Sequence, residues 1–134
     1  MTTTSQEKLA YIGKRYERLK AWQACHDLAL STYRVTAKWP IEERYGLVSQ
    51  ARRAAFSAAA NIAEGAAKRG PKEFRRFLDI AIGSLAELSY ILLLAAELGL
   101  PSPESIPETA ALCDHASRLT WGLYRVVAKR ATDG

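Results

Sequence analysis

The chain of 134 residues is long enough for one domain, because domains most often contain roughly 100–150 residues. Apolar residues make up 49% and charged residues 25% of it, a balance that excludes general disorder. Its two cysteines, Cys25 and Cys113, have neither a CxxC spacing nor a histidine pair at zinc-finger spacing. We therefore expect free, buried thiols and no metal site. The formal net charge of +5 favours an acidic partner such as nucleic acid.

The distribution of apolar residues indicates a cytoplasmic protein without a membrane partner. Residues 1–7 are polar, and no short apolar run near them ends in a small-residue cleavage site. The longest apolar stretch, residues 85–100, is interrupted by polar side chains, whereas a membrane span needs about 20 mostly apolar residues. We expect this stretch to form a buried helix.

Proline and glycine divide the chain into four predicted helices. Pro40 ends the first, because the residue before a proline is driven away from helical dihedral angles. Gly70 and Pro71 separate the second from the third, and Gly99 precedes the third break. The predicted helical spans are residues 16–38, 43–68, 71–98 and 105–130. They form one bundle domain, residues 16–130, preceded by an N-terminal arm, residues 1–15, and followed by a tail, residues 131–134.

The apolar spacing within these spans fits helices that pack together. In the third span the apolar positions alternate steps of four and three residues, as they do along a helix-bundle seam: Phe74, Leu78, Ala81, Leu85, Leu88, Leu92 and Ala95. The fourth span repeats these steps, and no long period-2 alternation indicates a strand. Short connections between long helices favour antiparallel neighbours. The predicted fold class is all-α, an antiparallel up-down four-helix bundle.

The second predicted helix differs from the others because alanines cover more than one of its faces. It holds nine alanines between residues 51 and 67, and Phe56 and Ile62 point in different directions. A helix that is apolar nearly all round must be buried on more than one side. In a domain this small, another copy of the chain can cover the second side. We therefore expect a homo-oligomer.

No pattern in the chain is typical of a catalytic centre. His26 and His115 lie on different predicted helices, and neither has a carboxylate at the spacing of a Glu-x-x-His pair. The sequence contains no phosphate-binding glycine loop and no GxSxG or HExxH motif. We predict that the protein is not an enzyme, has no catalytic residues and needs no cofactor or metal.

Polar residues of the second predicted helix are expected in a helix or subunit contact, where buried polar groups must be paired: Arg52, Arg53, Ser57, Asn61 and Glu64. We expect the two arginines to join helices or subunits through carboxylates such as Glu64 or Glu87. A lone carboxylate without a second base is poorly suited to acid–base chemistry. Only a polar cavity around an unpaired Glu64 would favour an unrecognised enzyme. Trp39 and Tyr45 are expected to cap one end of the core.

Two basic clusters are candidates for a nucleic-acid interface. The first gathers where the second helix ends and the third begins: Lys68, Arg69, Lys72, Arg75 and Arg76. The helix dipole opposes cations in a first turn, so their presence there points to an anionic partner. The second cluster, beside Tyr11 and Tyr16 with rings that can stack on bases, comprises Lys14, Arg15, Arg18 and Lys20. A solvated face that keeps the protein soluble explains the same charges equally well.

Three motifs carry a resemblance to a known family: NIAEG at residues 61–65, EFRRFL at residues 73–78 and GSLAEL at residues 83–88. With neighbouring stretches over residues 19–100, they resemble the bacterial family of the protein encoded in 23S rRNA intervening sequences, also called the S23 ribosomal protein family. The accessory variability determinant of diversity-generating retroelements is a relative. The resemblance implies a four-helix bundle that assembles as a five-membered ring. The retroelement relative is expected to bind nucleic acid and a reverse transcriptase. It carries over no catalytic residue.

These observations lead to one hypothesis of function and one alternative. The first is a non-catalytic homopentamer whose basic surface binds RNA or DNA with little sequence specificity. The alternative is a protein-interaction scaffold that presents a ring to a partner enzyme, such as a reverse transcriptase, without binding nucleic acid directly.

Overall fold

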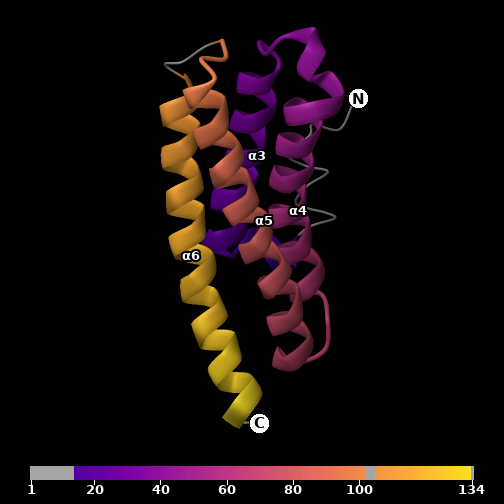
Figure 1. Ribbon diagram of the computed structural model, residues 1–134. Coiled ribbons are helices and arrows are strands. Elements are labelled where there is room, and N and C mark those ends of the chain that lie inside the picture. Colours follow the sequence, from indigo (N-terminus) through magenta and orange to yellow (C-terminus); the bar gives the residue numbers. More distant parts are fainter. Residues whose placement is uncertain (1–13, 102–104, 134) are drawn as a thin grey trace, which may run out of the picture.

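A computed structural model describes residues 14–101 and 105–133, and all regular structure within these ranges is helical. Four long helices lie side by side and alternate in direction (Figure 1): α3 Lys20–Thr36, α4 Ser49–Ala66, α5 Pro71–Glu97 and α6 Ser105–Asp133. Each packs against the next along the chain, and α6 closes the bundle against α3. This is the predicted up-down architecture. The predicted arm, apart from its last two residues, lies outside the described residues.

The helix boundaries differ most from the prediction at the start of α3, the start of α4 and the end of α6. A short helix, α2 Lys14–Glu17, precedes α3, and Leu19 between them has an extended backbone with φ −80° and ψ 122°. The Leu19 side chain packs against the core, which explains why the chain bends here instead of continuing as one helix. At the other end, α6 reaches Asp133 and buries Ala131. Residues 131–133 therefore belong to the helix and not to a tail.

The connection between α3 and α4 is also helical. A 3₁₀ turn, η1 Ile41–Glu43, leads into a π-type turn, η2 Arg44–Val48, which is kinked at Gly46. The Glu43 carboxylate accepts a hydrogen bond from the backbone N–H of Leu47 at 3.1 Å. This bond satisfies one of the free N–H groups that every helix start presents.

The two aromatic residues near this connection have different environments. Trp39 is buried and caps the core as predicted. Tyr45 is 89% exposed, so the prediction that it also caps the core is wrong. The π-type turn changes the angular position of Tyr45 relative to the buried face of α4, a change that a regular helical period does not anticipate.

The core consists of large aliphatic side chains packed against the small side chains of α4. The largest buried apolar side chains come mostly from α5: Leu28, Ile62, Leu78, Leu85, Leu88 and Leu92. On α4 the buried positions are mainly alanines, which allow neighbouring helices to approach closely. By length and composition α5 could cross a membrane, but it lies between α4 and α6 with eight buried residues, as a core helix does.

Hydroxyl and thiol groups lie within the contact between α3 and α6. The Thr32 and Thr120 hydroxyls each donate to the carbonyl four residues earlier at 2.7 Å, so they are satisfied within their own helices. The cysteines are free and buried, as predicted. Burial raises the pKa of both thiols, Cys25 and Cys113, to about 11. They therefore remain protonated and weakly nucleophilic at neutral pH.

A close contact between α4 and α5 lies at Gly65. A Cβ atom added there would lie 2.8 Å from the Cβ atom of Phe77 and 2.9 Å from the Cδ1 atom of Phe74. Only a residue without a side chain leaves room for the Phe77 Cβ atom and the Phe74 ring. The glycine of the NIAEG motif and the two phenylalanines of the EFRRFL motif are therefore parts of one packing contact.

We predict opposite effects for two glycine-to-alanine substitutions in helices. Gly65→Ala should lower the free energy of unfolding by about 1–3 kcal/mol, because overpacking displaces the phenylalanines. Gly83→Ala on α5 meets nothing within 4 Å and should raise it by about 0.5–1 kcal/mol through helix propensity. Urea unfolding followed by circular dichroism measures both. Equal effects of the two substitutions would contradict the packing role of Gly65.

Candidate nucleic-acid interface

The connection between α4 and α5 brings the first basic cluster together at one end of the bundle (Figure 1). α4 ends at Ala66, and α5 starts at Pro71 after Gly70, which has a φ of +89°. Glycine adopts this conformation without strain, so the chain reverses within a few residues. Arg75 of the cluster is half-buried. The other four side chains are exposed: Lys68, Arg69, Lys72 and Arg76.

Phe77 lies beneath two of these cations. The Lys68 Nζ atom is 5.4 Å and the Arg76 guanidinium carbon 5.1 Å from the centre of its ring. Both distances are typical of cation–π contacts, which contribute about 0.5–1 kcal/mol at exposed sites. Arg76 also pairs with Glu73 at 3.1 Å. The fold thus holds Lys68 and Arg76 in place.

Helix α6 brings further cations to the same end, and the sequence prediction missed them. A shallow hollow of about 310 Å³ lies between α6 and the α4–α5 connection. It is lined by Arg130 and Ala131 of α6 and by residues 69–72 of the connection and the start of α5. Figure 1 shows the yellow C-terminal end of α6 reaching past the α4–α5 connection. We call the combined set the basic end: Lys68, Arg69, Lys72, Arg75, Arg76, Lys129 and Arg130.

The signal for these residues was present in the charge pattern of α6. Between Asp114 and Asp133 the sequence has four basic residues and no acidic residue: Arg118, Arg125, Lys129 and Arg130. Counted over residues 101–134, four acidic residues balance them. Because α6 runs antiparallel to α5, its basic half lies beside the basic start of α5. Counting charge by half-helix would have found the contribution of α6.

The second predicted cluster lies on α2 and at the start of α3. Arg18 and Lys20 are exposed. Lys14 and Arg15 belong to α2, but their side chains, like Tyr11, lie outside the described residues. In Figure 1 this indigo segment lies part-way along the bundle and not at the end formed by the α4–α5 connection.

The aromatic residues near this cluster pack on one another. The ring centres of Tyr16 and Trp22 are 4.7 Å apart, and Trp22 stacks on His26 at 4.9 Å with an interplanar angle of 9°. The Tyr16 ring, which we expected to be available to bases, therefore has a partner within the fold. His26 is half-buried in this stack.

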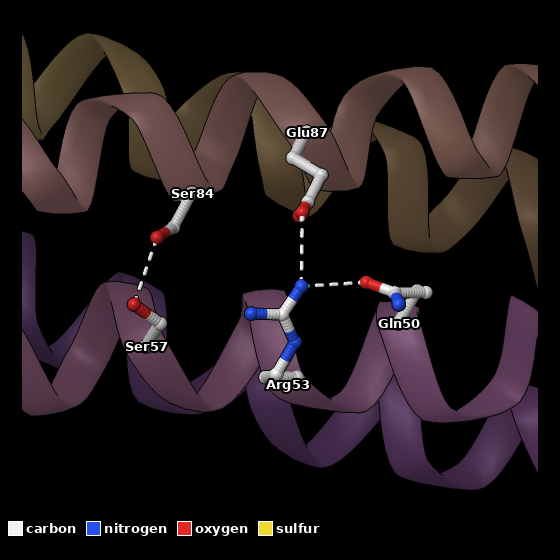
Figure 2. A network of polar contacts seen from close by, with 5 residues as sticks. All are labelled: Gln50, Arg53, Ser57, Ser84 and Glu87. Atoms are coloured by element: carbon white, nitrogen blue, oxygen red, sulfur yellow. Dashed lines mark hydrogen bonds and ion pairs between the residues drawn. The ribbon is translucent and has the colours of Figure 1, made fainter. Parts of the chain in front are cut away.

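A polar network joins α4 to α5 (Figure 2). The Ser84 hydroxyl of α5 donates to the Ser57 hydroxyl of α4 at 2.8 Å. Within α4, the side-chain amide of Asn61 donates to the Ser57 carbonyl at 2.8 Å. Arg53 donates to Gln50 at 2.6 Å and lies 3.7 Å from Glu87. The predicted pairing of Arg53 with Glu87 is thus present between two helices of one chain.

Glu64 does not take part in this network as the structure describes it. Its side chain is exposed to solvent, so the expected pairing of Glu64 with an arginine of α4 is not seen. The enzyme hypothesis required a buried, unpaired Glu64 in a polar cavity, and this exposure removes its basis. Within residues 14–101 and 105–133, no group of three His, Cys, Asp or Glu side chains is arranged to hold a metal ion.

The comparison with known families agrees with the arrangement of the motifs. A family model described as 23S rRNA-intervening sequence protein matches residues 17–122, from the end of α2 to the middle of α6. The chain belongs to this family. No curated protein matches the chain. The match ends before Arg125, so the last cations of α6 lie beyond it.

In this family member, Arg52 joins α4 to α3 without a carboxylate. Its Nε atom donates to the Thr36 hydroxyl at 2.9 Å and its Nη2 atom to the Tyr33 carbonyl at 3.3 Å. The guanidinium carbon also lies 4.7 Å from the centre of the Tyr33 ring. The expected carboxylate partner is replaced by the last turn of α3, which is the negative end of the helix dipole.

We predict different energetic roles for the two neighbouring arginines. Arg52→Ala should lower the free energy of unfolding by about 1.5–3 kcal/mol, because it removes charge-assisted hydrogen bonds to the end of α3. Arg53→Ala should change it by less than about 1 kcal/mol, because its side chain is 68% exposed and its ion pair is long. Chemical denaturation of both variants measures the difference. A larger loss for Arg53→Ala would contradict these roles.

Proposed function

We propose that this member of the 23S rRNA-intervening sequence family is a cytoplasmic, non-catalytic homo-oligomer that binds RNA or DNA with little sequence specificity. The observation that supports the proposal is the convergence of α4, α5 and α6 at the basic end. Side chains far apart in the sequence, Arg69 and Arg130, line one shallow hollow there. Phosphate is the ligand that suits such a surface, because exposed cations bind it without reading base identity.

The start of α5 adds to the attraction for phosphate. No side chain caps this helix, so the free N–H groups of its first turn keep their partial positive charge. Arg69 and Lys72 lie on either side of this helix start. The dipole disfavours Lys72 in the isolated protein, but a phosphate bound at this point interacts favourably with both the dipole and the cations.

The outer face of α4 supports self-association. Phe56 is 64% exposed, and Ala60, Ala63 and Ala67 follow it at helical steps of four, three and four residues. The exposed side chains of Ile41 and Tyr45 precede this stripe. A second copy that covered this face would remove apolar surface from water. The number of five subunits follows from the family resemblance.

A closed ring repeats the basic end in every subunit. Several weak contacts with one strand of nucleic acid then add as avidity, because each contact after the first forms at a high effective concentration. Each phosphate contact also releases counterions, so affinity falls steeply with rising salt. The proposal therefore requires strong dependence on ionic strength.

We predict that Arg69→Glu with Lys72→Glu weakens binding to structured RNA and makes its salt dependence shallower by about one unit of log–log slope for each lost phosphate contact. Fluorescence anisotropy over a salt series measures both quantities. The matched control is Arg34→Glu with Lys38→Glu, which makes the same charge change at exposed positions of the opposite end of the bundle. Equal losses in the two variants would show that only net charge matters.

The same assay separates the proposal from the scaffold alternative. Absence of RNA and DNA binding even at low salt would refute nucleic-acid binding. A partner protein that is retained on the immobilised chain after nuclease treatment would then favour a scaffold.

We predict that the wild-type protein has a multimeric mass by light scattering at micromolar concentration. Phe56→Glu should shift this mass towards the monomer, because a charge in the buried α4 face prevents close packing. Tyr90→Glu on α5 is the control, since Tyr90 is 62% exposed and thus similar to Phe56. A monomeric wild-type protein would contradict the proposed assembly.

A further inference from the structure

An exposed tryptophan lies between two arginines on the outer surface of α6. Trp121 is 43% exposed, and Arg118 and Arg125 are three residues before and four residues after it. Helix positions at these spacings share one face. Together with Ser117, these side chains line an open hollow of about 510 Å³. We call Arg118, Trp121 and Arg125 the α6 platform.

The indole ring of the platform has a fixed neighbour. Tyr124 meets Trp121 edge to face, with ring centres 5.6 Å apart and planes at 78°. Edge-to-face contact is a preferred geometry of aromatic pairs and favours this orientation of the ring. Within the described parts of the chain, the cation–π contacts involve Tyr33 and Phe77, so neither platform arginine covers the indole. The exposed part of the ring remains open to a ligand.

The two platform arginines have no acidic partner in the described structure. The ion pairs among residues 14–101 and 105–133 involve Arg53 and Arg76, not Arg118 or Arg125. The nearest acidic residue along α6 is Asp114, one helical turn before Arg118. The platform is therefore an aromatic surface with uncompensated positive charge on both sides.

We propose that the α6 platform binds an unpaired nucleobase of a single-stranded nucleic acid. The base stacks on Trp121, and the phosphates on either side of it contact Arg118 and Arg125. Seven helical residues separate the two arginines by about 10 Å along the axis, so one cation lies near each side of a stacked base. The inference rests on the proposed function and extends it from phosphate binding to base stacking.

The chemistry of the platform favours a single strand over other anionic partners. An acidic protein surface would satisfy the two arginines but makes no particular use of a flat ring between them. A duplex offers phosphates but keeps the faces of its bases stacked within the helix. A single strand provides both an exposed base and flanking phosphates, and base–aromatic stacking accepts every base. The platform thus distinguishes single-stranded from double-stranded nucleic acid but does not distinguish one base from another.

Two oligonucleotides of equal length and charge test the inference by fluorescence anisotropy. One is oligothymidine, and the other is its abasic analogue with the same phosphates. Wild-type protein should bind oligothymidine roughly 5- to 100-fold more tightly, the range expected for stacking of a base on an aromatic ring. Trp121→Ala should abolish this preference without changing affinity for the abasic strand. Trp121→Phe should retain part of it, and the control Tyr90→Ala should retain all of it.

The outcomes separate this inference from the proposed function. Equal affinity of the wild-type protein for both strands, or a preference that persists in Trp121→Ala, would overturn base stacking and leave phosphate binding intact. Failure of the wild-type protein to bind either strand at low salt would overturn base stacking, and failure to bind structured RNA and duplex DNA as well would overturn both. If Trp121→Ala fails to fold, Trp121→Phe carries the assignment to Trp121, because a preference that is not reduced in this variant contradicts stacking on the indole.

Discussion

The contact of Phe74 and Phe77 with the bare backbone of Gly65 is the constraint on which the functional end of the bundle depends. It sets the distance between α4 and α5 where the chain reverses. It also places the Phe77 ring under Lys68 and Arg76, so an apolar contact positions charged groups. Packing and charge are therefore not separate properties here. The surface that we propose for phosphate binding is built on this close contact between α4 and α5.

The antiparallel topology then decides which charges act together. α6 is acidic near its start and basic towards its end, and α5 is basic at its start. Because neighbouring helices run in opposite directions, the basic parts of both lie at one end of the bundle. A parallel arrangement would have placed the basic part of α6 beside the apolar end of α5. The charge asymmetry of the protein is thus a product of its connectivity.

The fold was accessible from the sequence because its determinants are local. Proline and glycine positions gave most helix boundaries to within four residues, but α4 starts six residues later than predicted. The steps of three and four residues identified the buried face of α5. The pairing of Arg53 with Glu87 also followed, since both lie on helices predicted to be neighbours. The break at Leu19 was missed because the side chain is held by distant core residues.

The candidate site was accessible only in part, because it depends on distances between residues far apart in the sequence. The cluster around Gly70 is continuous in sequence and was found. Arg130 joins it only through the reversal of α6, and the carbonyl partner of Arg52 lies at the end of another helix. The exposure of Trp121 depends on which side of α6 its neighbours cover. The carbonyl partner of Arg52 and the exposure of Trp121 have no signature in composition or periodicity, whereas the basic half of α6 is visible in its charge pattern.

The unequal lengths of the helices affect how rigid the two halves of the molecule are. α3 has 17 residues and α6 has 29, roughly 26 Å against roughly 44 Å of helix. The end of α6 therefore extends beyond the start of α3. Fewer neighbouring residues protect the backbone hydrogen bonds of this part of α6. Segments of this kind open at lower free energy than the centre of a domain. Lys129 and Arg130 lie on this segment, so local opening of the helix end moves these two cations while the centre of the bundle stays unchanged.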